Sequence, residues 1–580
     1  MEKKTAHTHF SNQQLAETFR LIADLLEIKG EVIYKVLAYR KAADSLEHMG
    51  QSAEELWQEN RLGEIPGVGK AISEKMDELF STGQLQFLEK LKAEVPVGLA
   101  ELLQVPDVGP KKAKMFWKEL GVTNVAELET AARAGKLRDL PGMGEKSEAR
   151  ILAGLEALSR RTTRTPLGVA WPFANEIARW LGSLPGVVAA NPAGSLRRMR
   201  ETVGDLDISA ATEDPAPVMD AFIHHPRVIE VFAVGDVKSS VEFDNHLRAQ
   251  LWLHRPEQYG TALLYATGSK DHNVRLREIA QTMKLSLSDR SFLQPDGSEK
   301  FYATEEEVYA VLGLPWIPPE LREDRGEIQA AKAGRLPHLI EVKDIVAELH
   351  SHSTWSDGQA SILEMAQAAQ QRGLKAIAIT DHSHSLGVTG GMTAEDIRAR
   401  MAEVREAQAK MGDSFTILQG AEVEIRNDGR LDYPDEVLAE LDVVIASLHT
   451  GLRQPKEQVT ARLIKAIQNP HVDIIGHPTG RLIPDREGAD LDMNPVLQAA
   501  KESGVALEIN ANPSRLDLDD IQSRRAIEMG IPLSINTDAH SPDNLDFLMY
   551  GVATARRGWV EPQHVINAWP VEKLVQWLKR

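Results

Sequence analysis

The spacing of apolar residues changes along the chain and predicts three kinds of structure. Up to residue 165, apolar residues recur at helical intervals, as they do from Leu15 to Leu26 and from Val32 to Leu46. Helical and strand-like segments are mixed from residue 166 to residue 325. From residue 337, short apolar runs alternate with helical stretches. The pattern therefore predicts a multidomain α and α/β protein whose N-terminal part is helical.

Polar residues follow each apolar run of the last region. Seven such runs end near His352, His382, Glu422, His449, His477, Asn512 and His540. Strands that alternate with helices in this way are typical of a TIM-like barrel, here a (β/α)7 barrel, and the active site of such a barrel lies at the carboxyl ends of its strands.

Imidazoles and carboxylates gather at these predicted strand ends, and the chain contains no cysteine. Such a ligand set suits Mn²⁺, Zn²⁺ or Fe²⁺ better than Mg²⁺. Single histidines are more often structural, whereas nine candidates at strand ends favour a centre of up to three ions. Because bound ions activate water and hold a scissile phosphate, the centre predicts phosphoester hydrolysis. The predicted ligands are His350, His352, Asp357, His382, Glu422, His449, His477, Asp538 and His540.

Three glycine turns interrupt the helical N-terminal part. They read IPGVGK (65–70), VPDVGP (105–110) and LPGMGEK (140–146). In a helix-hairpin-helix, such a turn brings backbone N–H groups and a helix N-terminus close to a DNA phosphate, without reading the base sequence. A lone turn of this kind is often only a tight connection between helices, but three copies favour DNA binding. The second copy departs from the pattern, because Asp107 replaces its first glycine. The predicted DNA contacts are Gly67, Gly69, Lys70, Gly109, Gly142, Gly144 and Lys146.

The segments AYRKAA (38–43) and IPGVGKAISEKMDELF (65–80) resemble the small N-terminal domain of family X DNA polymerases. The resemblance implies that Lys75 acts as a Schiff-base nucleophile, which removes the 5'-deoxyribose phosphate at an abasic site. Nearby cationic groups would favour this role by lowering the pKa of the amine. The alternative is that Lys75 is an ordinary solvated helix lysine.

The central region contains GSLRRMRETVGDLDI (194–208), a pattern typical of nucleotidyltransferases. Asp205 and Asp207 are two residues apart on a predicted strand, so both carboxylates face the same way and can bind Mg²⁺ or Mn²⁺ with a nucleotide triphosphate. Gly194, Ser195 and Arg198 are predicted to donate hydrogen bonds to its phosphates.

This region also resembles family X polymerases, but with one departure. By the resemblance, YGTALLYATGSKDHN (259–273) lines the dNTP pocket through Tyr265, Gly268 and Asn273. The third metal carboxylate of the family aligns with Gln250, and its supporting arginine aligns with Trp252. A neutral amide is a poor proton acceptor, and its loss of charge costs about a hundredfold to a thousandfold in rate. We therefore predict weak or absent DNA synthesis.

The barrel motifs HSHSTWSDG (350–358), TDH (380–382), SLH (447–449), GHPTGR (476–481) and TDAH (537–540) resemble the polymerase and histidinol phosphatase (PHP) domain of bacterial family X polymerases. The resemblance implies cleavage of DNA from the 3' end and action at abasic sites, with His350 catalytic. We predict that Arg481 contacts the phosphate as a further catalytic residue, together with Asn510 and Arg515. Arg515 has an alternative partner in Asp517 or Asp519.

These motifs define the expected domains. A helical domain with a helix-hairpin-helix covers residues 1–85, and a second hairpin domain covers residues 86–165. A nucleotidyltransferase palm and thumb cover residues 166–325, and the PHP barrel covers residues 337–580. A charged link rich in proline, from Pro315 to Pro337, precedes the barrel.

Composition adds few constraints. The net charge of -19 argues against nucleic acid, but the first 165 residues are nearly neutral, and carboxylates in the later domains can surround cations. Zero cysteines exclude disulfides and thiolate metal sites. We find neither a secretory leader nor a run of about 18 apolar residues, so we expect a cytoplasmic protein without membrane contact. We also expect a monomer.

The sequence therefore predicts a DNA repair enzyme that binds gapped, nicked or abasic DNA and acts as a metal-dependent 3'-5' exonuclease, with dNTPs as ligands of the central region. One alternative is a templated gap-filling polymerase in which Glu242 or Asp244 replaces the missing carboxylate. A second is a small-molecule phosphatase of the histidinol phosphate type. The three hairpins disfavour it, because such an enzyme does not need to bind DNA. A third is a non-catalytic scaffold, which the full ligand set of the barrel disfavours.

Overall fold

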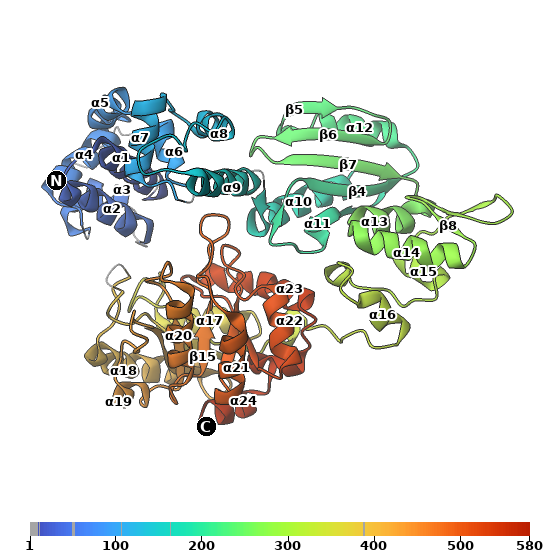
Figure 1. Cartoon of the computed structure of the whole chain (residues 1–580). Coiled ribbons are helices and arrows are strands. Elements are labelled where there is room, and N and C mark those ends of the chain that lie inside the picture. The colour runs from blue at the N-terminus through green and yellow to red at the C-terminus, as the bar shows by residue number, and fades with distance from the viewer. Residues whose placement is uncertain are drawn as a thin grey trace. The chain divides into compact units, whose positions relative to one another are not determined.

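The computed structural model describes residue 10 and residues 12–48, 53–65, 67–105, 107–162, 164–386 and 389–579. The described residues form two compact units that divide at residue 164 (Figure 1). We call residues 10–162 the hairpin region, which lies in the first unit. The central region (residues 164–325) and the barrel (residues 337–386 and 390–579) lie together in the second unit.

Every regular element described in the hairpin region is helical, as the apolar spacing predicts. One apolar core runs through the region and includes Phe19, Trp57, Phe80 and Phe116, all nearly fully buried. None of the helices described in the whole chain has the length and apolar character of a membrane span. The helices are α1 (Asn12–Lys29), α2 (Ile33–His48), α3 (Ala53–Gln58), α4 (Lys70–Thr82), α5 (Gln86–Glu94), α6 (Gly98–Leu102), α7 (Pro110–Leu120), α8 (Val125–Arg133) and α9 (Glu145–Thr162).

The central region begins with a five-stranded sheet in the order β2-β4-β7-β6-β5. Strands β4 and β7 are parallel and place Asp207 opposite Gln250, while the other neighbouring pairs are antiparallel. The sheet strands are β2 (Val187–Pro192), β4 (Leu206–Thr212), β5 (Val228–Ala233), β6 (Lys238–Phe243) and β7 (Arg248–His254). The remaining elements here are β1 (Thr165–Pro166) paired with β3 (Thr202–Val203), and helices α10 (Leu167–Gly182), α11 (Gly194–Arg197) and α12 (Pro215–Ile223).

A smaller helical subdomain follows the sheet and has its own apolar core. The predicted link from Pro315 to Pro337 is packed against it: Leu321 and Ile328 belong to this core, and buried Arg322 pairs with Glu305 at 2.6 Å. The segment is therefore part of the folded unit. Its elements are α13 (Tyr259–Thr267), α14 (Lys270–Thr282), β8 (Ser286–Leu287), β9 (Phe292–Leu293), β10 (Glu299–Lys300), α15 (Glu305–Val311) and α16 (Glu327–Lys332).

The barrel contains seven parallel strands in sequential order, which confirms the predicted fold. A parallel bridge between Ser351 and Ala539 joins the chain beyond its first strand to the chain beyond its last. The strands are β11 (Ala347–Glu348), β12 (Ala376–Ile379), β13 (Thr416–Glu424), β14 (Val443–Ser447), β15 (Ile474–Gly476), β16 (Ala506–Asn510) and β17 (Leu533–Asn536). The helices are α17 (Ile362–Gln371), α18 (Ala394–Met411), α19 (Asp435–Leu438), α20 (Lys456–Ile467), α21 (Met493–Ser503), α22 (Asp520–Glu528), α23 (Leu548–Arg557) and α24 (Val571–Leu578).

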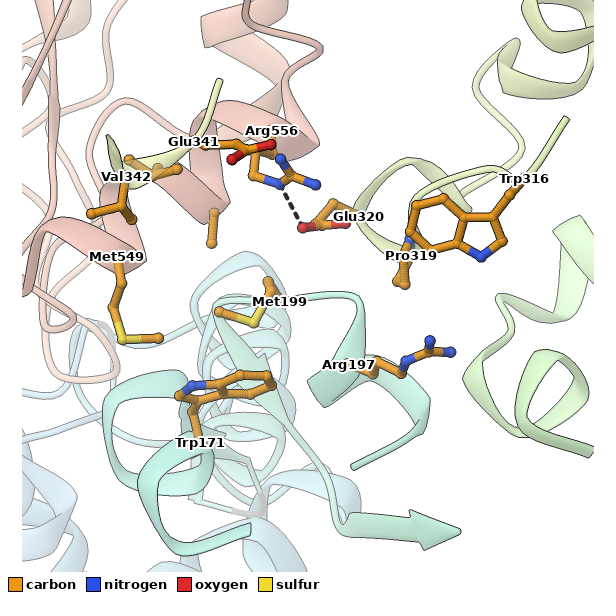
Figure 2. A pocket seen from close by; sticks show the side chains of 12 residues that line it. Trp171, Arg197, Met199, Trp316, Pro319, Glu320, Glu341, Val342, Met549 and Arg556 are labelled. Carbon is orange, nitrogen blue, oxygen red and sulfur yellow. Dashed lines mark hydrogen bonds and ion pairs between the residues drawn. The ribbon is translucent and has the colours of Figure 1, made fainter. Parts of the chain in front are cut away.

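The barrel and the central region pack directly on each other within the second unit. Tyr550 and Ala553 of α23 belong to the same apolar cluster as the buried face of α10. Arg556 of α23 donates a hydrogen bond of 2.6 Å to Glu320. These contacts border an open pocket of about 380 Å³, which Figure 2 shows between side chains of both parts. The two parts are therefore joined by side-chain packing as well as by the chain that links them.

Candidate functional sites

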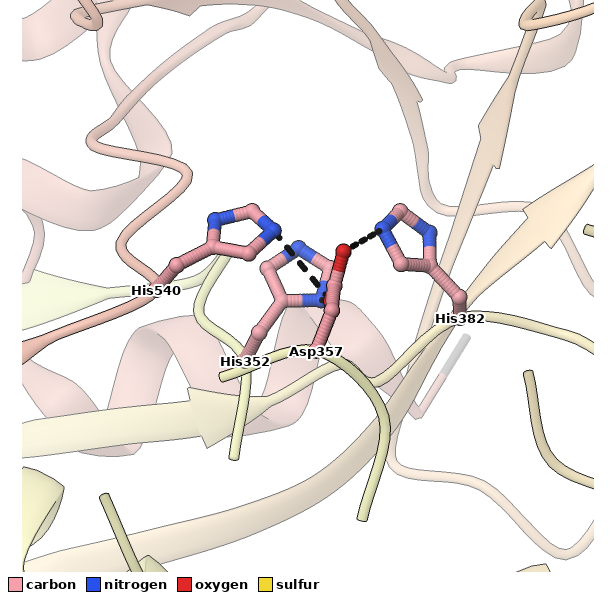
Figure 3. A group of neighbouring side chains, drawn as sticks. All are labelled: His352, Asp357, His382 and His540. Carbon is pink, nitrogen blue, oxygen red and sulfur yellow. Dashed lines mark ion pairs between the residues drawn. The ribbon is translucent and has the colours of Figure 1, made fainter. Parts of the chain in front are cut away.

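The nine predicted barrel ligands converge at one end of the barrel. Parallel strands direct their carboxyl ends to the same face, and each ligand lies within or shortly after a strand or in the loop that follows it. Eight of them form three groups in which the ligand atoms lie within 4.8 Å of one another. The ninth, His477, places Nε2 2.8 Å from the Glu422 carboxylate. The groups are His352, Asp357, His382 and His540 (Figure 3), then His350, His352, Glu422 and Asp538, and finally His382, Glu422 and His449.

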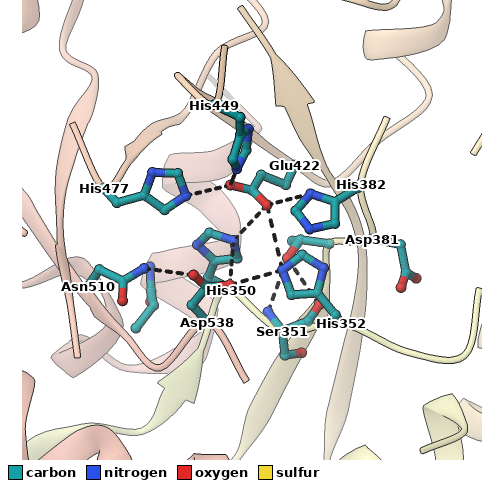
Figure 4. A network of polar contacts seen from close by, with 12 residues as sticks. His350, Ser351, His352, Asp381, His382, Glu422, His449, His477, Asn510 and Asp538 are labelled. Carbon is teal, nitrogen blue, oxygen red and sulfur yellow. Dashed lines mark hydrogen bonds and ion pairs between the residues drawn. The ribbon is translucent and has the colours of Figure 1, made fainter. Parts of the chain in front are cut away.

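Glu422 lies at the centre of this cluster (Figure 4). Its fully buried carboxylate is 2.9 Å from His382 Nδ1 and 3.2 Å from His449 Nε2. It also lies 3.4 Å from His350 Nε2 and 3.6 Å from His352 Nε2. A buried carboxylate surrounded by imidazoles from several strands would be suited to hold divalent cations.

Several buried atoms of the cluster have no hydrogen-bond partner among the described residues. They include His352 Nδ1 and His477 Nδ1. His382 Nδ1 and His350 Nε2 lie 2.9 Å and 3.4 Å from Glu422 Oε2, but without the geometry of a hydrogen bond. Because buried polar atoms are almost always partnered, so many unpartnered atoms in one place fit metal coordination. The nitrogen and oxygen donors, without sulfur, fit Mn²⁺ or Zn²⁺.

The electrostatics of the cluster follow from buried opposite charges. Burial alone would lower the pKa of His350, but the carboxylates of Glu508, Asp538 and Glu422 raise it well above the ordinary value. Burial would raise the pKa of Glu422, whereas the imidazoles of His449 and His350 hold it well below its usual range. Protons and metal ions therefore compete for the same imidazole nitrogens.

Two carboxylates that were not predicted from the sequence orient predicted ligands. They contact the imidazole nitrogen that faces away from the centre of the cluster. Glu508 lies 2.8 Å from His350 Nδ1 and accepts a hydrogen bond of 2.6 Å from the His477 backbone N–H. Glu424 lies 2.9 Å from His449 Nδ1. Each leaves the opposite imidazole nitrogen available to a metal. The period of two along a strand was a usable signal, because Glu424 is two residues after Glu422.

Replacement of Glu508 with glutamine is expected to weaken metal binding about tenfold to a hundredfold, because the amide no longer fixes the His350 ring through a charged acceptor. Titration calorimetry of the metal-free protein with Mn²⁺ measures this effect. Glu572→Gln on the exposed face of α24 is the matched control. Equal affinity in the intact protein and Glu508→Gln would exclude an orienting role.

The three predicted phosphate-binding residues have different positions. Asn510 Nδ2 donates to Asp538 Oδ2 at 3.1 Å, so it supports a ligand. Arg481 is turned to other partners, because it donates to the carbonyl oxygens of Arg515 and Leu516 and pairs with Glu201. The geometry therefore does not support direct phosphate contact by Arg481.

Arg515 is the guanidinium that reaches the cluster. Its Nε is 3.4 Å from Asp538 Oδ2, instead of pairing with Asp517 or Asp519 as the alternative from sequence held. Its buried Nη1 has no hydrogen-bond partner among the described residues. A buried donor beside the ligands is suited to an anionic ligand.

In the central region, Asp205 immediately precedes β4 and Asp207 lies within it. Burial and the neighbouring Asp205 raise the pKa of Asp207 to about 7. Two carboxylates this close favour a bound cation, which would relieve their repulsion. Gly194 permits the close packing beside them, because an added Cβ would lie 2.2 Å from Asp207 Oδ2. Ser195 follows it in the half-buried first turn of α11.

Gln250, the predicted replacement of the third carboxylate, donates from Nε2 to Asp205 Oδ2 at 2.7 Å. The amide thus occupies a lone pair that a cation would use. Neither Glu242 nor Asp244, the suggested substitutes for the third carboxylate, lies beside Gln250. The strand register places Ser240 opposite Gln250 and Glu242 opposite Arg248. Asp244 pairs with Arg227 at 3.0 Å.

The predicted nucleotide-binding residues lie near one another, but some of them already form hydrogen bonds with other protein groups. Arg198 donates to the Thr267 carbonyl at 2.5 Å and to Glu323 at 3.1 Å. Its predicted phosphate contact would require these bonds to change. Gly268 packs against this guanidinium with φ +71°. Asn273 donates to the Tyr265 carbonyl at 2.9 Å, and the Tyr265 side chain is exposed.

The three turns of the hairpin region have the geometry that their sequence predicts. Gly67 and Gly142 have positive φ of 79° and 74°, and Asp107 adopts 67° in the second copy. Gly69 and Gly109 are the N-cap residues that precede α4 and α7, and neither helix has a side-chain cap, which leaves N–H groups for an anion. Gly144 precedes α9, and Lys70 and Lys146 are exposed. Asp107 pairs with Arg150 at 3.0 Å.

Lys75 lies on α4. Its Nζ donates to the Ala71 carbonyl at 3.1 Å and stands 4.9 Å from the centre of the Phe87 ring. The structure thus places the amine near an aromatic face and leaves the lyase role a prediction.

Comparisons with known proteins match the three regions. Family models match a helix-hairpin-helix domain at residues 10–85, a SAM-like helix-hairpin-helix tandem at 99–157, a DNA polymerase beta thumb at 262–323 and a PHP domain at 348–512. The chain is 42% identical over 562 residues to the DNA polymerase/3'-5' exonuclease PolX of Bacillus subtilis (strain 168), and the match covers 96% of this chain and 98% of the relative.

Other relatives match the barrel alone. A probable phosphatase of Thermoanaerobacter sp. (strain X514) is 32% identical over 247 residues, which cover 40% of this chain and 95% of that protein. A probable phosphatase of Caldanaerobacter subterraneus subsp. tengcongensis is 37% identical over 208 residues, which cover 34% of this chain and 76% of that protein.

Proposed function

Because the chain belongs to the PolX family of bacterial family X DNA polymerases with a PHP domain, we propose that it is a DNA repair enzyme that shortens DNA from the 3' end. The observation that carries this proposal is the convergence of nine ligand side chains in the barrel. The hairpin region supplies contacts to the DNA backbone. The proposed substrates are gapped, nicked and abasic DNA, the protein acts as a monomer, and its compartment is the cytoplasm.

The nine barrel side chains would hold up to three divalent ions, Mn²⁺ or Zn²⁺. Such ions supply an activated water molecule and neutralise charge on the scissile phosphate. Glu508 keeps the His350 ring oriented through Nδ1. Arg515 donates from Nη1 to a phosphate oxygen, since this atom is buried beside Asp538 and without a partner among the described residues.

In the central region, Asp205 and Asp207 would hold Mg²⁺ or Mn²⁺ with a dNTP. Gln250 stands in place of the third carboxylate of the family and donates a hydrogen bond to Asp205. The region therefore binds DNA and nucleotide and supports little synthesis.

The proposal is tested with a gapped duplex labelled at the primer 5' end, incubated with Mn²⁺ and all four dNTPs. Progressive shortening of the primer without extension is the expected result. A second duplex with an abasic site tests incision there. Extension in place of shortening would favour the gap-filling polymerase.

A small-molecule phosphatase is the second candidate, because the probable phosphatases match the barrel over most of their own length. Release of phosphate from p-nitrophenyl phosphate, with no effect on DNA, would establish that function instead. The three hairpins favour DNA, which a small-molecule phosphatase does not need to bind.

Removal of a hairpin lysine is expected to weaken DNA binding irrespective of base sequence. In Lys70→Ala or Lys146→Ala, one phosphate contact is lost, so the slope of log Kd against log salt concentration falls by about 1. Fluorescence anisotropy with a labelled gapped duplex at several salt concentrations measures this slope. Lys90→Ala on α5 is the matched control, and an unchanged slope in both hairpin variants would argue against the contacts.

A further inference from the structure

The loop that carries Arg515, residues 512–518, is packed against the central region. Pro513 lies so close to Gly168 of α10 that a Cβ added to Gly168 would be 2.5 Å from the Pro513 ring. Leu516 is 1% exposed and belongs to the apolar cluster of the central region, with Leu167 and Ala170. One side of this barrel loop is thus packed against residues of the central region.

The backbone of the loop needs such support. Leu516 has φ +47°, a left-handed conformation that is unfavourable for a residue other than glycine. Strained residues of this kind persist when the surrounding contacts hold them. The burial of Leu516 between the barrel and α10 supplies those contacts.

Arg481 fixes the carbonyl groups of the same loop. Its Nε donates to the Arg515 carbonyl at 2.8 Å, and its Nη2 donates to the Leu516 carbonyl. The same Nη2 is 2.8 Å from the carboxylate of Glu201, a central-region residue. Glu201 is itself held through its carbonyl, which accepts a hydrogen bond of 2.9 Å from the Leu167 N–H.

We infer that Arg481 and Glu201 are positioning residues, which hold the Arg515 guanidinium beside the barrel ligands for contact with the scissile phosphate. The inference rests on the proposed function of the barrel. It assigns Arg481 an indirect role in place of phosphate contact. It also makes the central region part of the exonuclease site, whether or not this region synthesises DNA.

If Arg481 and Glu201 act through Arg515, the three variants should lower kcat by different factors. Arg515→Ala loses a charged phosphate contact and is expected to lower kcat for primer shortening about a hundredfold. Arg481→Ala lets the loop shift and is expected to lower kcat about tenfold to a hundredfold. Glu201→Gln has a smaller effect, about threefold to tenfold, because Arg481 keeps its two carbonyl acceptors.

The decisive experiment follows primer shortening and determines both kcat and KM for these variants, singly and in combination with Arg515→Ala. If Arg481 and Glu201 act through Arg515, neither change lowers kcat further in the Arg515→Ala background. Arg481→Lys retains the charge beside Glu201 but not the paired carbonyl contacts, so it is expected to behave like Arg481→Ala. Equal losses of kcat with and without Arg515 would overturn the inference.

A binding measurement separates positioning from general damage. The Kd is determined in Ca²⁺ for a single-stranded oligonucleotide and for the same strand with a neutral methylphosphonate at its 3'-terminal linkage. The intact protein is expected to prefer the charged strand about tenfold, and Arg515→Ala and Arg481→Ala are expected to lose most of this preference. Full preference in Arg481→Ala would contradict the inference.

Two controls complete the design. Glu440→Gln removes an exposed ion pair of the barrel with Arg398 and is expected to leave kcat unchanged. Thermal unfolding of every variant identifies any loss of fold. Failure of the intact protein to shorten DNA would refute the proposed function, whereas shortening with additive effects of the variants would refute the inference alone.

Discussion

Replacement of His350 with alanine is expected to abolish 3' shortening of DNA, with a fall in kcat on the order of a thousandfold or more. His350 Nε2 is a buried atom beside Glu422 and Asp538, so its loss removes a ligand from the middle of the cluster. A divalent ion contributes several kcal/mol to charge stabilisation in phosphoester hydrolysis, and each 1.36 kcal/mol corresponds to about a factor of ten.

The measurement follows a gapped duplex labelled at the primer 5' end. Treatment of the intact protein with a chelator should reproduce the His350→Ala defect, and Mn²⁺ should restore only the intact protein. His471→Ala is the matched control, because this half-buried barrel histidine lies outside the three ligand groups. Shortening that survives both chelation and His350→Ala would mean that the barrel is not the nuclease.

The second large effect is a gain of function. Gln250→Asp is expected to increase primer extension about a hundredfold to a thousandfold, because it restores a proton acceptor and metal ligand opposite Asp207. It also removes the hydrogen bond that the amide donates to Asp205. Extension by the variant should disappear again when Asp205 is replaced with alanine.

Gln250→Asn is the matched control, since its side chain has the length of aspartate without the charge. Extension is measured with the same duplex in the His350→Ala background, which prevents the nuclease from removing the product. A third carboxylate beside Asp207 also increases repulsion, so the melting temperature of Gln250→Asp should rise more with Mg²⁺ than that of the intact protein. Efficient extension by the intact protein would refute our interpretation of Gln250.

Local patterns were sufficient to predict the barrel and the polar side chains that converge at one end of it. The apolar run that becomes β15 is followed directly by His477, and the strand period alone implies that this side chain lies at the barrel mouth. Similarly, the spacing of Asp205 and Asp207 fixes their common face. Such features depend on neighbouring residues in sequence, which periodicity describes well.

The partners of those residues were not predictable in the same way. Glu508 supports His350 across 158 positions, and nothing near His350 in the sequence indicates this carboxylate. Gln250 was recognised as a substitution, but its hydrogen bond to Asp205 depends on the pairing of β4 with β7. We expected Arg481 to contact the phosphate, because it follows the GHPTG motif in the sequence. Its actual partners, Glu201 and the carbonyl groups of the Arg515 loop, are distant in the sequence, so no local pattern could indicate them.

The sequence by itself determined the helical hairpins, the seven strands and the imidazoles and carboxylates that follow those strands, because apolar period and turn residues act over short distances. The tertiary structure decided which of the charged residues meet. It brings Arg515 to Asp538 and turns Arg481 to Glu201 of the central region. The physical reason is that a buried charge is stable only with a partner, and which partner is available depends on how distant segments pack.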